Sequence, residues 1–182
     1  RSEWPELDVY LTSVTDHYST ASICGPNSKK ILMKLFPNVK FDDENFPHMS
    51  FQNASLDKIN CRIMRISFTG EHSYEINIEA KYGKSLWEKC IEAGKEFNIT
   101  PYGTETMHLL RAEKGFIIVG QDTDGTMTPI DLQMDWIVSK KKFDFIGKRS
   151  LYRSDTIRED RKQLVGLVTR SEEHTSELQS PC

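Results

Sequence analysis

Two stretches near the middle of the chain alternate apolar and polar residues with a period of two, which is the pattern of half-buried β-strands. In 62–68, the residues Met64, Ile66 and Phe68 share one face. In the stretch 74–78, Tyr74, Ile76 and Ile78 share one face. Glu75 and Asn77 lie on the opposite face, and Glu79, directly after the stretch, continues it. Gly70 lies in the short connection between them and is free to adopt positive φ. The pattern predicts a hairpin.

Helical spacing of apolar residues follows at two places. A helix is predicted to open at Pro26, with Ile31, Leu32, Leu35 and Phe36 on one face. A second is predicted over 82–97. Residues 9–14 and 18–24 are rich in β-branched and aromatic residues and predict strands, while 37–56 predicts a loop with one short strand. The order of strand, helix, strand, strand and helix from Tyr18 onward favours an α+β fold with a ferredoxin-like βαββα layer.

The stretch 101–125 combines a helix, an apolar run and a turn. Thr104 can cap a helix that begins at Glu105, and Gly115 stands where a left-handed residue would end it. The run 116–119 is too short for a helix and predicts a strand or an extended buried segment. Residues 121–125 predict a turn, and 163–169 predicts the first strand of a further domain.

Composition narrows the class of protein. The chain has 182 residues, 37% hydrophobic and 28% charged, which fits a soluble globular protein. The formal net charge of -3 gives no electrostatic reason to expect nucleic acid, and no apolar run is long enough for a membrane span. The cysteines at 24, 61 and 90 match no metal or redox spacing, and they favour reduced thiols in a cytoplasmic protein.

The two ends of the sequence suggest a fragment. It starts at Arg1 without a methionine, so we expect it to begin within a longer gene. Residues 170–180 read RSEEHTSELQS, which resembles the translation of a sequencing adapter. We therefore treat 170–182 as a non-native tail, expect it to be disordered, and keep it out of the fold prediction.

No pattern of a self-contained catalyst is present, so no catalytic residue is predicted. The stretch Asp122–Gly125 suggests a calcium loop, but Met127 and Gln133 occupy the positions that need glycine and glutamate. The histidines are isolated from one another, and no metal site is predicted.

Glu75 leaves two interpretations open from the pattern alone. It is either an exposed strand acid or a carboxylate on an uncovered sheet face that accepts two parallel hydrogen bonds. Arg111, Glu113 and Lys114 are ambiguous in the same way, since they form either a solvated helix end or the rim of a pocket.

Four segments resemble one family in the order in which the family carries them. They are CGPNSKKIL at 24–32, RISFTGEHSYEI at 65–76, the stretch from Ile99 to Pro129, and LQMDWIVSKKKFDFIGKRSL at 132–151. Together they resemble the α subunits of heterotetrameric sarcosine oxidases, within the wider family of the glycine-cleavage T-protein (aminomethyltransferase). The resemblance implies a folate-binding domain over 1–160, the start of a C-terminal barrel domain at 161–169, and the absence of the rest of that barrel.

The same resemblance implies a function. Such complexes demethylate sarcosine oxidatively to glycine and pass the one-carbon unit to tetrahydrofolate. FAD, FMN and NAD are expected elsewhere in the complex, together with β, γ and δ subunits as partners, so the fragment alone is expected to be inactive. The family tripeptide that matches Tyr74, Glu75 and Ile76 holds the pterin ring, and Arg111 is expected at the same folate site. The chain departs from the folate-binding pattern at Met107, where relatives carry arginine.

Two further function classes remain open at this stage. One is another enzyme of the family, namely aminomethyltransferase itself or dimethylglycine dehydrogenase. The other is a non-catalytic folate-binding module.

Overall fold

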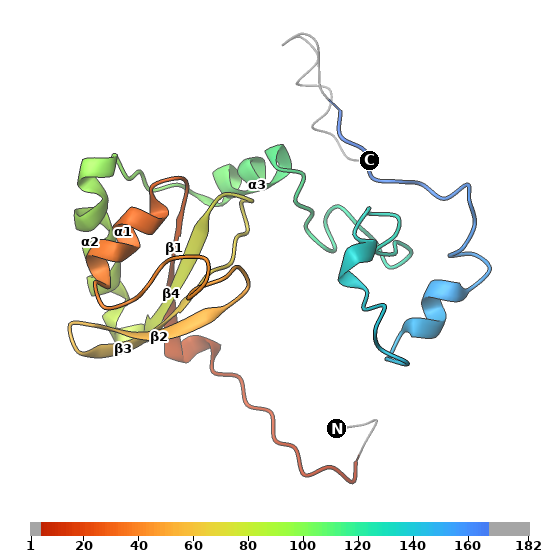
Figure 1. Ribbon diagram of the computed structural model, residues 1–182, viewed down its shortest axis with the longest axis horizontal. Helices are drawn as coiled ribbons and strands as arrows, with labels where there is room; N and C mark the ends of the chain where they lie inside the picture. Colours follow the sequence, from red (N-terminus) through yellow and green to blue (C-terminus); the bar gives the residue numbers. More distant parts are fainter. Residues whose placement is uncertain (1–4, 168–182) are drawn as a thin grey trace. The chain divides into compact units, whose positions relative to one another are not determined.

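The computed structural model describes residues 5–167, and the chain divides after Phe116 into two compact units. The first unit contains a four-stranded antiparallel sheet in the order β1-β4-β3-β2 (Figure 1). Its strands are β1 (Tyr18–Cys24), β2 (Phe51–Leu56), β3 (Ile59–Met64) and β4 (Ser73–Glu79). Its α-helices are α1 (Ser28–Leu35), α2 (Gly83–Gly94) and α3 (Thr104–Glu113). Single 3₁₀ turns lie at Thr15–His17, Ala80–Tyr82 and Lys95–Phe97.

One face of the sheet forms the core of this unit. Helices α1 and α2 contact each other, and both contact the central strand β4 (Figure 1). Helix α2 also contacts β1, and α1 shares a hydrophobic core with it. The buried residues alternate along the strands, as the pleat requires. They are Ala21 and Ile23 on β1, Cys61 and Ile63 on β3, Tyr74, Ile76 and Ile78 on β4, Ile31 and Leu32 on α1, and Leu86 and Cys90 on α2. The α+β class is therefore confirmed.

The predicted hairpin partner of β4 is shifted along the chain. This partner is β3, and it pairs with β4 in the antiparallel direction, as expected. The strand spans 59–64 instead of 62–68, and Ile63 faces the core where Met64 was expected to do so. The cause is a tight turn at Asp57 and Lys58, which both adopt positive φ and connect β2 to β3. This turn fixes the register, and a shift of one residue exchanges the two faces of a strand.

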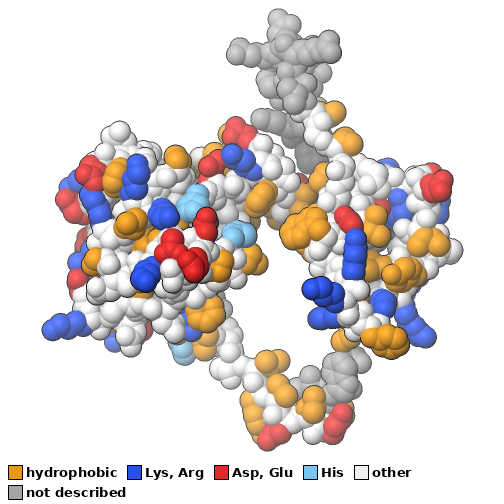
Figure 2. All heavy atoms as spheres, viewed as in Figure 1, with side chains coloured by type: hydrophobic (Ala, Val, Ile, Leu, Met, Phe, Trp, Pro, Cys, Tyr) orange, Lys and Arg blue, Asp and Glu red, His pale blue; other side chains and the backbone are white. Residues whose placement is uncertain are grey.

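The prediction of a strand at 9–14 is wrong, and so is that of a strand or an extended buried segment at 116–119, where Phe116 and Val119 are exposed. Residues 9–14 lie outside the sheet, and their apolar side chains are exposed, visible on the segment that precedes β1 (Figure 2). Residues 116–119 form no strand either, because the main-chain N–H of Ile118 donates to the carboxylate of Asp122 at 2.7 Å and Ile118 accepts from the amide of Gln121. Local bonds of this kind compete with a sheet ladder.

The helix predictions are confirmed with small changes at their ends. Helix α1 begins at Ser28, two residues after Pro26, and α2 with its following 3₁₀ turn covers most of 82–97. Helix α3 begins at Thr104, so the N-cap is Gly103 and not Thr104. Gly115 has a φ of 73° and ends the helix as expected. Within the described range, no helix is long and apolar enough to cross a membrane.

The second unit begins at Ile117 and has little regular structure in its described part. It contains 3₁₀ turns at Asp135–Ile137 and Lys148–Tyr152, and the part of the predicted strand 163–169 that can be seen, 163–167, is not a strand. The predicted tail 170–182 lies outside the described residues. The boundary at Phe116 falls inside the expected domain 1–160, so that domain assignment stays a prediction.

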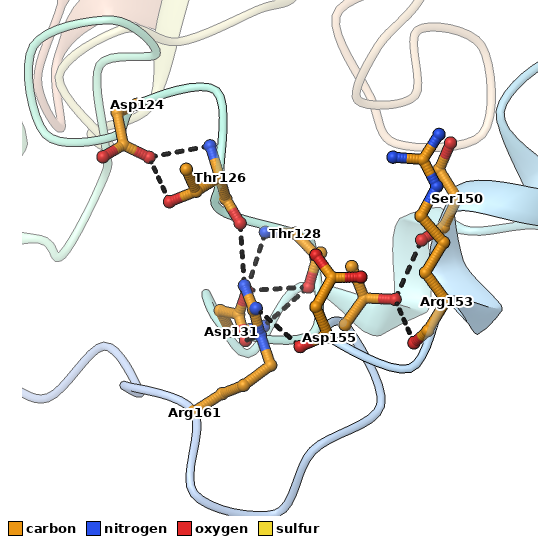
Figure 3. Close-up of polar contacts among 9 residues, drawn as sticks. Asp124, Thr126, Thr128, Asp131, Ser150, Arg153, Asp155 and Arg161 are labelled. Atoms are coloured by element: carbon orange, nitrogen blue, oxygen red, sulfur yellow. Dashed lines mark hydrogen bonds and ion pairs between the residues drawn. The ribbon is translucent and has the colours of Figure 1, made fainter.

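A buried ion pair organises this second unit (Figure 3). The guanidinium of Arg161 donates from Nε and Nη2 to the two carboxylate oxygens of Asp131 at 2.8 and 2.5 Å. The amide and hydroxyl of Thr128 donate to the same carboxylate, and Arg161 also reaches the carbonyl of Thr126 at 2.7 Å. The pair therefore ties residues separated by about 30 positions in the chain.

The hydrogen bonds of Arg161 hold the pKa of Asp131 well below its usual range. Because the pKa of Asp131 is lower in the folded than in the unfolded chain, ionisation of this carboxyl stabilises the fold. The stabilisation is complete above the pKa of an unfolded aspartate, about 4, and is lost as the pH falls through the lower pKa of the folded state. The ion pair is therefore intact at neutral pH, where its removal can be tested.

We expect Asp131→Asn to release Arg161 from this pair and to speed tryptic cleavage after Arg161 at neutral pH by roughly tenfold, since opening of the segment controls cleavage. Asp135→Asn is the matched control, because it removes an exposed carboxylate from the same unit. The Oδ2 atom of Asp135 lies 3.8 Å from Nζ of Lys140, so this ion pair is long and exposed to solvent. Mass spectrometry of the peptides over time measures both rates. Equal rates for Asp131→Asn and the unaltered chain would show that the pair does not restrain this segment.

Candidate functional site

The face of the sheet opposite the core carries two rows of side chains, most of them polar. The register aligns Ser22, Glu75, Met64 and Phe51 in one row across β1, β4, β3 and β2. The next row is Thr20, Asn77, Arg62 and Asn53. These positions alternate with the buried ones along each strand, so the same period that builds the core also gathers these groups on a single surface. We call this surface the open face.

Glu75 lies at the centre of the open face, as its alternation with Tyr74 and Ile76 predicts. It is half-buried, and among the described residues no hydrogen bond or ion pair reaches its carboxylate. Burial raises the pKa of Glu75. A partly desolvated carboxylate with both oxygens open gains most from a ligand that brings two hydrogen-bond donors.

Tyr102 closes one side of the surface next to Glu75. The thiol of Cys24 and the phenol oxygen of Tyr102 are 3.2 Å apart, and the phenol also reaches the side chain of Ser22, the register partner of Glu75. Burial and the contact with Cys24 raise the pKa of Tyr102 to about 12, and the charge of Glu75 acts in the same direction. The phenol therefore stays protonated at neutral pH and keeps a proton to donate.

Asn77 adds a second polar group on the same strand face, two residues from Glu75. Its Oδ1 accepts a hydrogen bond from the hydroxyl of Thr20 at 2.7 Å. Its Nδ2 is buried and has no partner within the described part of the chain. Glu75 is thus an unused acceptor on the open face, whereas the unsatisfied Nδ2 of Asn77 is enclosed by the protein beside it.

Tyr74, which was expected at the cofactor site together with Glu75, points to the other side of the sheet. It is fully buried and packs against the rings of Phe41 and Phe46, with centroid distances of 5.5 and 5.8 Å. Its hydroxyl lies 2.8 Å from Nε2 of His72. Burial raises the pKa of Tyr74 and lowers that of His72, so both groups are neutral at physiological pH. The structure does not bring Tyr74 and Glu75 together.

Arg111, the third expected site residue, lies in the last turn of α3 and is buried. Its Nη1 donates to the carbonyl of Phe116 at 3.1 Å, which holds the chain that leaves the helix. Helix α3 is held to the loop before β4 by stacking of His108 on Phe68 and by an ion pair of Lys114 with Glu71 at 2.8 Å. These contacts position the helix end that was expected to border the folate site.

A cavity of about 430 Å³ borders this region of the first unit. Ser22, Tyr102 and the first turn of α3 line it, and so does Met107, the position where the resemblance led us to expect arginine. Glu75 is not among the lining residues, although its neighbours Ser22 and Tyr102 are. Within the described residues, no group of three or more His, Cys, Asp or Glu side chains could hold a metal ion.

Sequence reasoning placed Asn77 on the face of Glu75 without assigning it a role, and it missed Ser22 and Tyr102 as members of this surface. Alternation alone placed Asn77 beside Glu75, and its polar character inside an apolar strand was a usable signal. Ser22 and Tyr102 carried no such signal, because they reach Glu75 only through the pairing of β1 with β4 and through the path of the chain before α3.

The chain belongs to the family of the GCVT N-terminal domain, whose model matches residues 1–142. A solved structure supports the same fold: the glycine cleavage system aminomethyltransferase T from Bartonella henselae superposes with a TM-score of 0.53 at 24% identity, over 68% of this chain and 31% of that one.

Two groups of curated relatives refine this assignment. The sarcosine oxidase subunit alpha of Corynebacterium sp. (strain P-1) is 57% identical over 92% of this chain, and that of Rhizobium meliloti is 41% identical over 91%. An aminomethyltransferase of Halothermothrix orenii is 34% identical over 78% of the chain. The chain spans 17% of the length of the two sarcosine oxidase subunits and 39% of the aminomethyltransferase. The resemblance predicted from the sequence is confirmed.

Proposed function

We propose that this chain is the folate-binding region of a sarcosine oxidase α subunit, and that Glu75 holds the pterin ring of tetrahydrofolate. The observation that carries the proposal is the half-buried Glu75 carboxylate on the open face, which no described group engages. The higher identity to sarcosine oxidase subunits, 57% against 34%, favours this reaction over that of the aminomethyltransferases.

The chemistry of the two partners fits. A pterin ring presents an amino group and a ring N–H side by side, and a carboxylate accepts two such parallel hydrogen bonds. The raised pKa of Glu75 shows that its charge lacks stabilisation at present, so two incoming donors would lower that pKa and favour the ionised form.

Tetrahydrofolate supplies the acceptor for a one-carbon unit, here the unit released when sarcosine is demethylated to glycine. The role of this chain is to bind and orient that acceptor. We assign the oxidation to FAD, FMN and NAD sites elsewhere in the complex, and the β, γ and δ subunits are the proposed partners. We assign Tyr74 a positioning role from the core side of β4, and Arg111 a role in holding the end of α3.

The proposal also includes the fold of the sheet and the two helices that cover it. We interpret β1, α1, β3, β4 and α2 as one ferredoxin-like layer of the folate-binding fold, with β2 added at its edge. The open face is then the surface on which folate lies.

The test is Glu75→Gln in the complete sarcosine oxidase complex. Glutamine replaces one acceptor oxygen by a donor and removes the charge, and a charged hydrogen bond contributes roughly 1.5–3 kcal/mol. We expect tetrahydrofolate to bind about tenfold more weakly or worse, which corresponds to about 1.4 kcal/mol. Sarcosine should still be oxidised, with more free formaldehyde and less methylenetetrahydrofolate. Titration calorimetry and product analysis measure the two effects.

Glu79→Gln is the control for this experiment. Glu79 lies on the same strand and face, but it is exposed and pairs with Lys81 at 2.9 Å. Its substitution should leave folate affinity and product ratio unchanged. If Glu75→Gln leaves both unchanged as well, Glu75 is only a strand acid and the proposed function of this surface is wrong.

A further inference from the structure

Tyr102 places a phenol beside the carboxylate of Glu75. Ser22 lies directly opposite Glu75 in the pairing of β1 with β4, and side chains paired in this way have Cβ atoms roughly 5 Å apart. The phenol of Tyr102 bonds to the side chain of Ser22 and lies near enough to Glu75 for that charge to act on it. Tyr102 is also 37% exposed. The phenol is therefore a neighbour of the Glu75 carboxylate and is accessible to a ligand bound there.

The contacts of this phenol leave its proton unused. The thiol of Cys24 donates to the phenol oxygen of Tyr102 at 3.2 Å. The hydroxyl of Ser22 rotates, so it can donate to the same oxygen, and a phenol oxygen accepts as well as donates. Among the described residues, no further hydrogen-bond partner reaches the phenol. Tyr102 therefore offers a donor next to the acceptor that Glu75 offers.

The segment before α3 holds Tyr102 in place from both sides. The chain turns at Asn98, which has a φ of 55°, and the amide of Ile99 donates to the carbonyl of Gly94 at 3.2 Å. Ile99 packs so closely on Gly94 that a Cβ there would lie 2.6 Å from it. On the other side, Gly103 is the N-cap of α3. Because the segment is tied to a helix at each end, little freedom is lost when a ligand binds to the phenol.

We propose, resting on the proposed function of Glu75, that the phenol of Tyr102 donates a hydrogen bond to the ring carbonyl of the bound pterin. Along the edge of a pterin, the amino group and the ring N–H are followed by a carbonyl, so the edge presents two donors and then an acceptor. The carboxylate of Glu75 accepts from the two donors, and the carbonyl beside them needs a donor from the protein. Tyr102 supplies this donor from the adjacent strand side.

This contact makes Tyr102 a residue that determines which pteridines bind. With Cys24 and Ser22 as donors to its oxygen, the phenol has only its proton left for a ligand, so it pairs with a carbonyl and not with an amino group. A site built for one hydrogen bond discriminates against a ligand that does not make it. Folic acid carries the carbonyl. Aminopterin has the same tail and oxidation state, but an amino group replaces the carbonyl and the ring N–H beside it is lost.

Tyr102→Phe in the complete sarcosine oxidase complex tests the contact, because it keeps the ring and removes only the hydroxyl. We expect folic acid and tetrahydrofolate to bind about tenfold more weakly, since their carbonyl loses its donor in a partly desolvated site. Aminopterin should bind with unchanged affinity. Titration calorimetry measures all three ligands. Tyr18→Phe is the matched control, because Tyr18 is an exposed tyrosine on β1 that lies opposite Glu79. It should leave the three affinities unchanged.

The outcomes separate this contact from the proposed function. Equal losses for folic acid and aminopterin in Tyr102→Phe would overturn the contact, because the hydroxyl would then act only through the packing beside β1. No loss for any ligand, while Glu75→Gln still weakens tetrahydrofolate binding, would also overturn it and leave the role of Glu75 intact. If neither variant weakens binding, the proposed function fails and the contact of Tyr102 fails with it.

Discussion

Replacing Gly70 with alanine is expected to destabilise the first unit by about 3 kcal/mol, the sum of a left-handed backbone penalty and a steric one. Gly70 has a φ of 77°, which L side chains rarely adopt. A Cβ there would lie 2.6 Å from Cβ and 2.8 Å from Cγ of Lys114. Because the Cβ of Lys114 is fixed to the backbone, α3 or the loop before β4 must move. Urea unfolding of the chain measures the change.

Gly25→Ala separates the two contributions. Gly25 also has positive φ, 108°, but nothing lies within 4 Å of its added Cβ, so only the backbone penalty should remain. A double-mutant cycle of Gly70→Ala with Lys114→Gly then isolates the steric part, since Lys114→Gly removes the clashing atoms. Equal destabilisation by Gly70→Ala and Gly25→Ala, with no coupling in the cycle, would show that α3 is not held against this loop.

Much of the first unit could be predicted from local pattern. The alternation in β4 separated Tyr74 from Glu75 correctly, and Gly115 marked the end of α3. The register of β3 could not be predicted, because Asp57 and Lys58 adopt positive φ without the glycine or asparagine that usually signals such a turn. A fixed β-hairpin upstream then decided which residues of β3 face the core.

Apolar composition alone misled the strand prediction at both ends of the unit. Residues 9–14 and 116–119 contain the β-branched and aromatic residues that strands favour, but a strand also needs a neighbour with which to pair. Neither segment is part of the sheet. At 116–119, the carboxylate of Asp122 takes the amide that a ladder would need.

The candidate site was predictable only in part for the same reason. The position of Glu75 on the face away from the core follows from a period of two and needs no tertiary information. Tyr102 reaches it across 27 residues of sequence, through a contact with Cys24 on a strand whose pairing depends on long-range register. Local pattern thus identified the carboxylate, while tertiary structure supplied its surroundings.

Tyr74 offers the second large effect, and it distinguishes a core residue from a ligand contact. Tyr74→Ala should destabilise the first unit by about 4 kcal/mol, as expected when a fully buried aromatic side chain leaves a cavity. Tyr74→Phe keeps the ring between Phe41 and Phe46 and removes only the hydroxyl that contacts His72, so a loss of about 1–2 kcal/mol is expected. Urea unfolding measures both variants.

Folate binding by the Tyr74→Phe variant of the complete complex decides which role Tyr74 has. Its hydroxyl lies 2.8 Å from His72 on the core side of β4, while Glu75 lies on the open face. We therefore expect tetrahydrofolate affinity to change less than about twofold, against tenfold or more for Glu75→Gln. His72→Phe, which keeps a ring against Tyr74 but removes the partner of the same hydroxyl, should give a similar stability loss and the same unchanged affinity. A tenfold loss of affinity in Tyr74→Phe with unchanged stability would place the hydroxyl in contact with the ligand and contradict its assignment to the core.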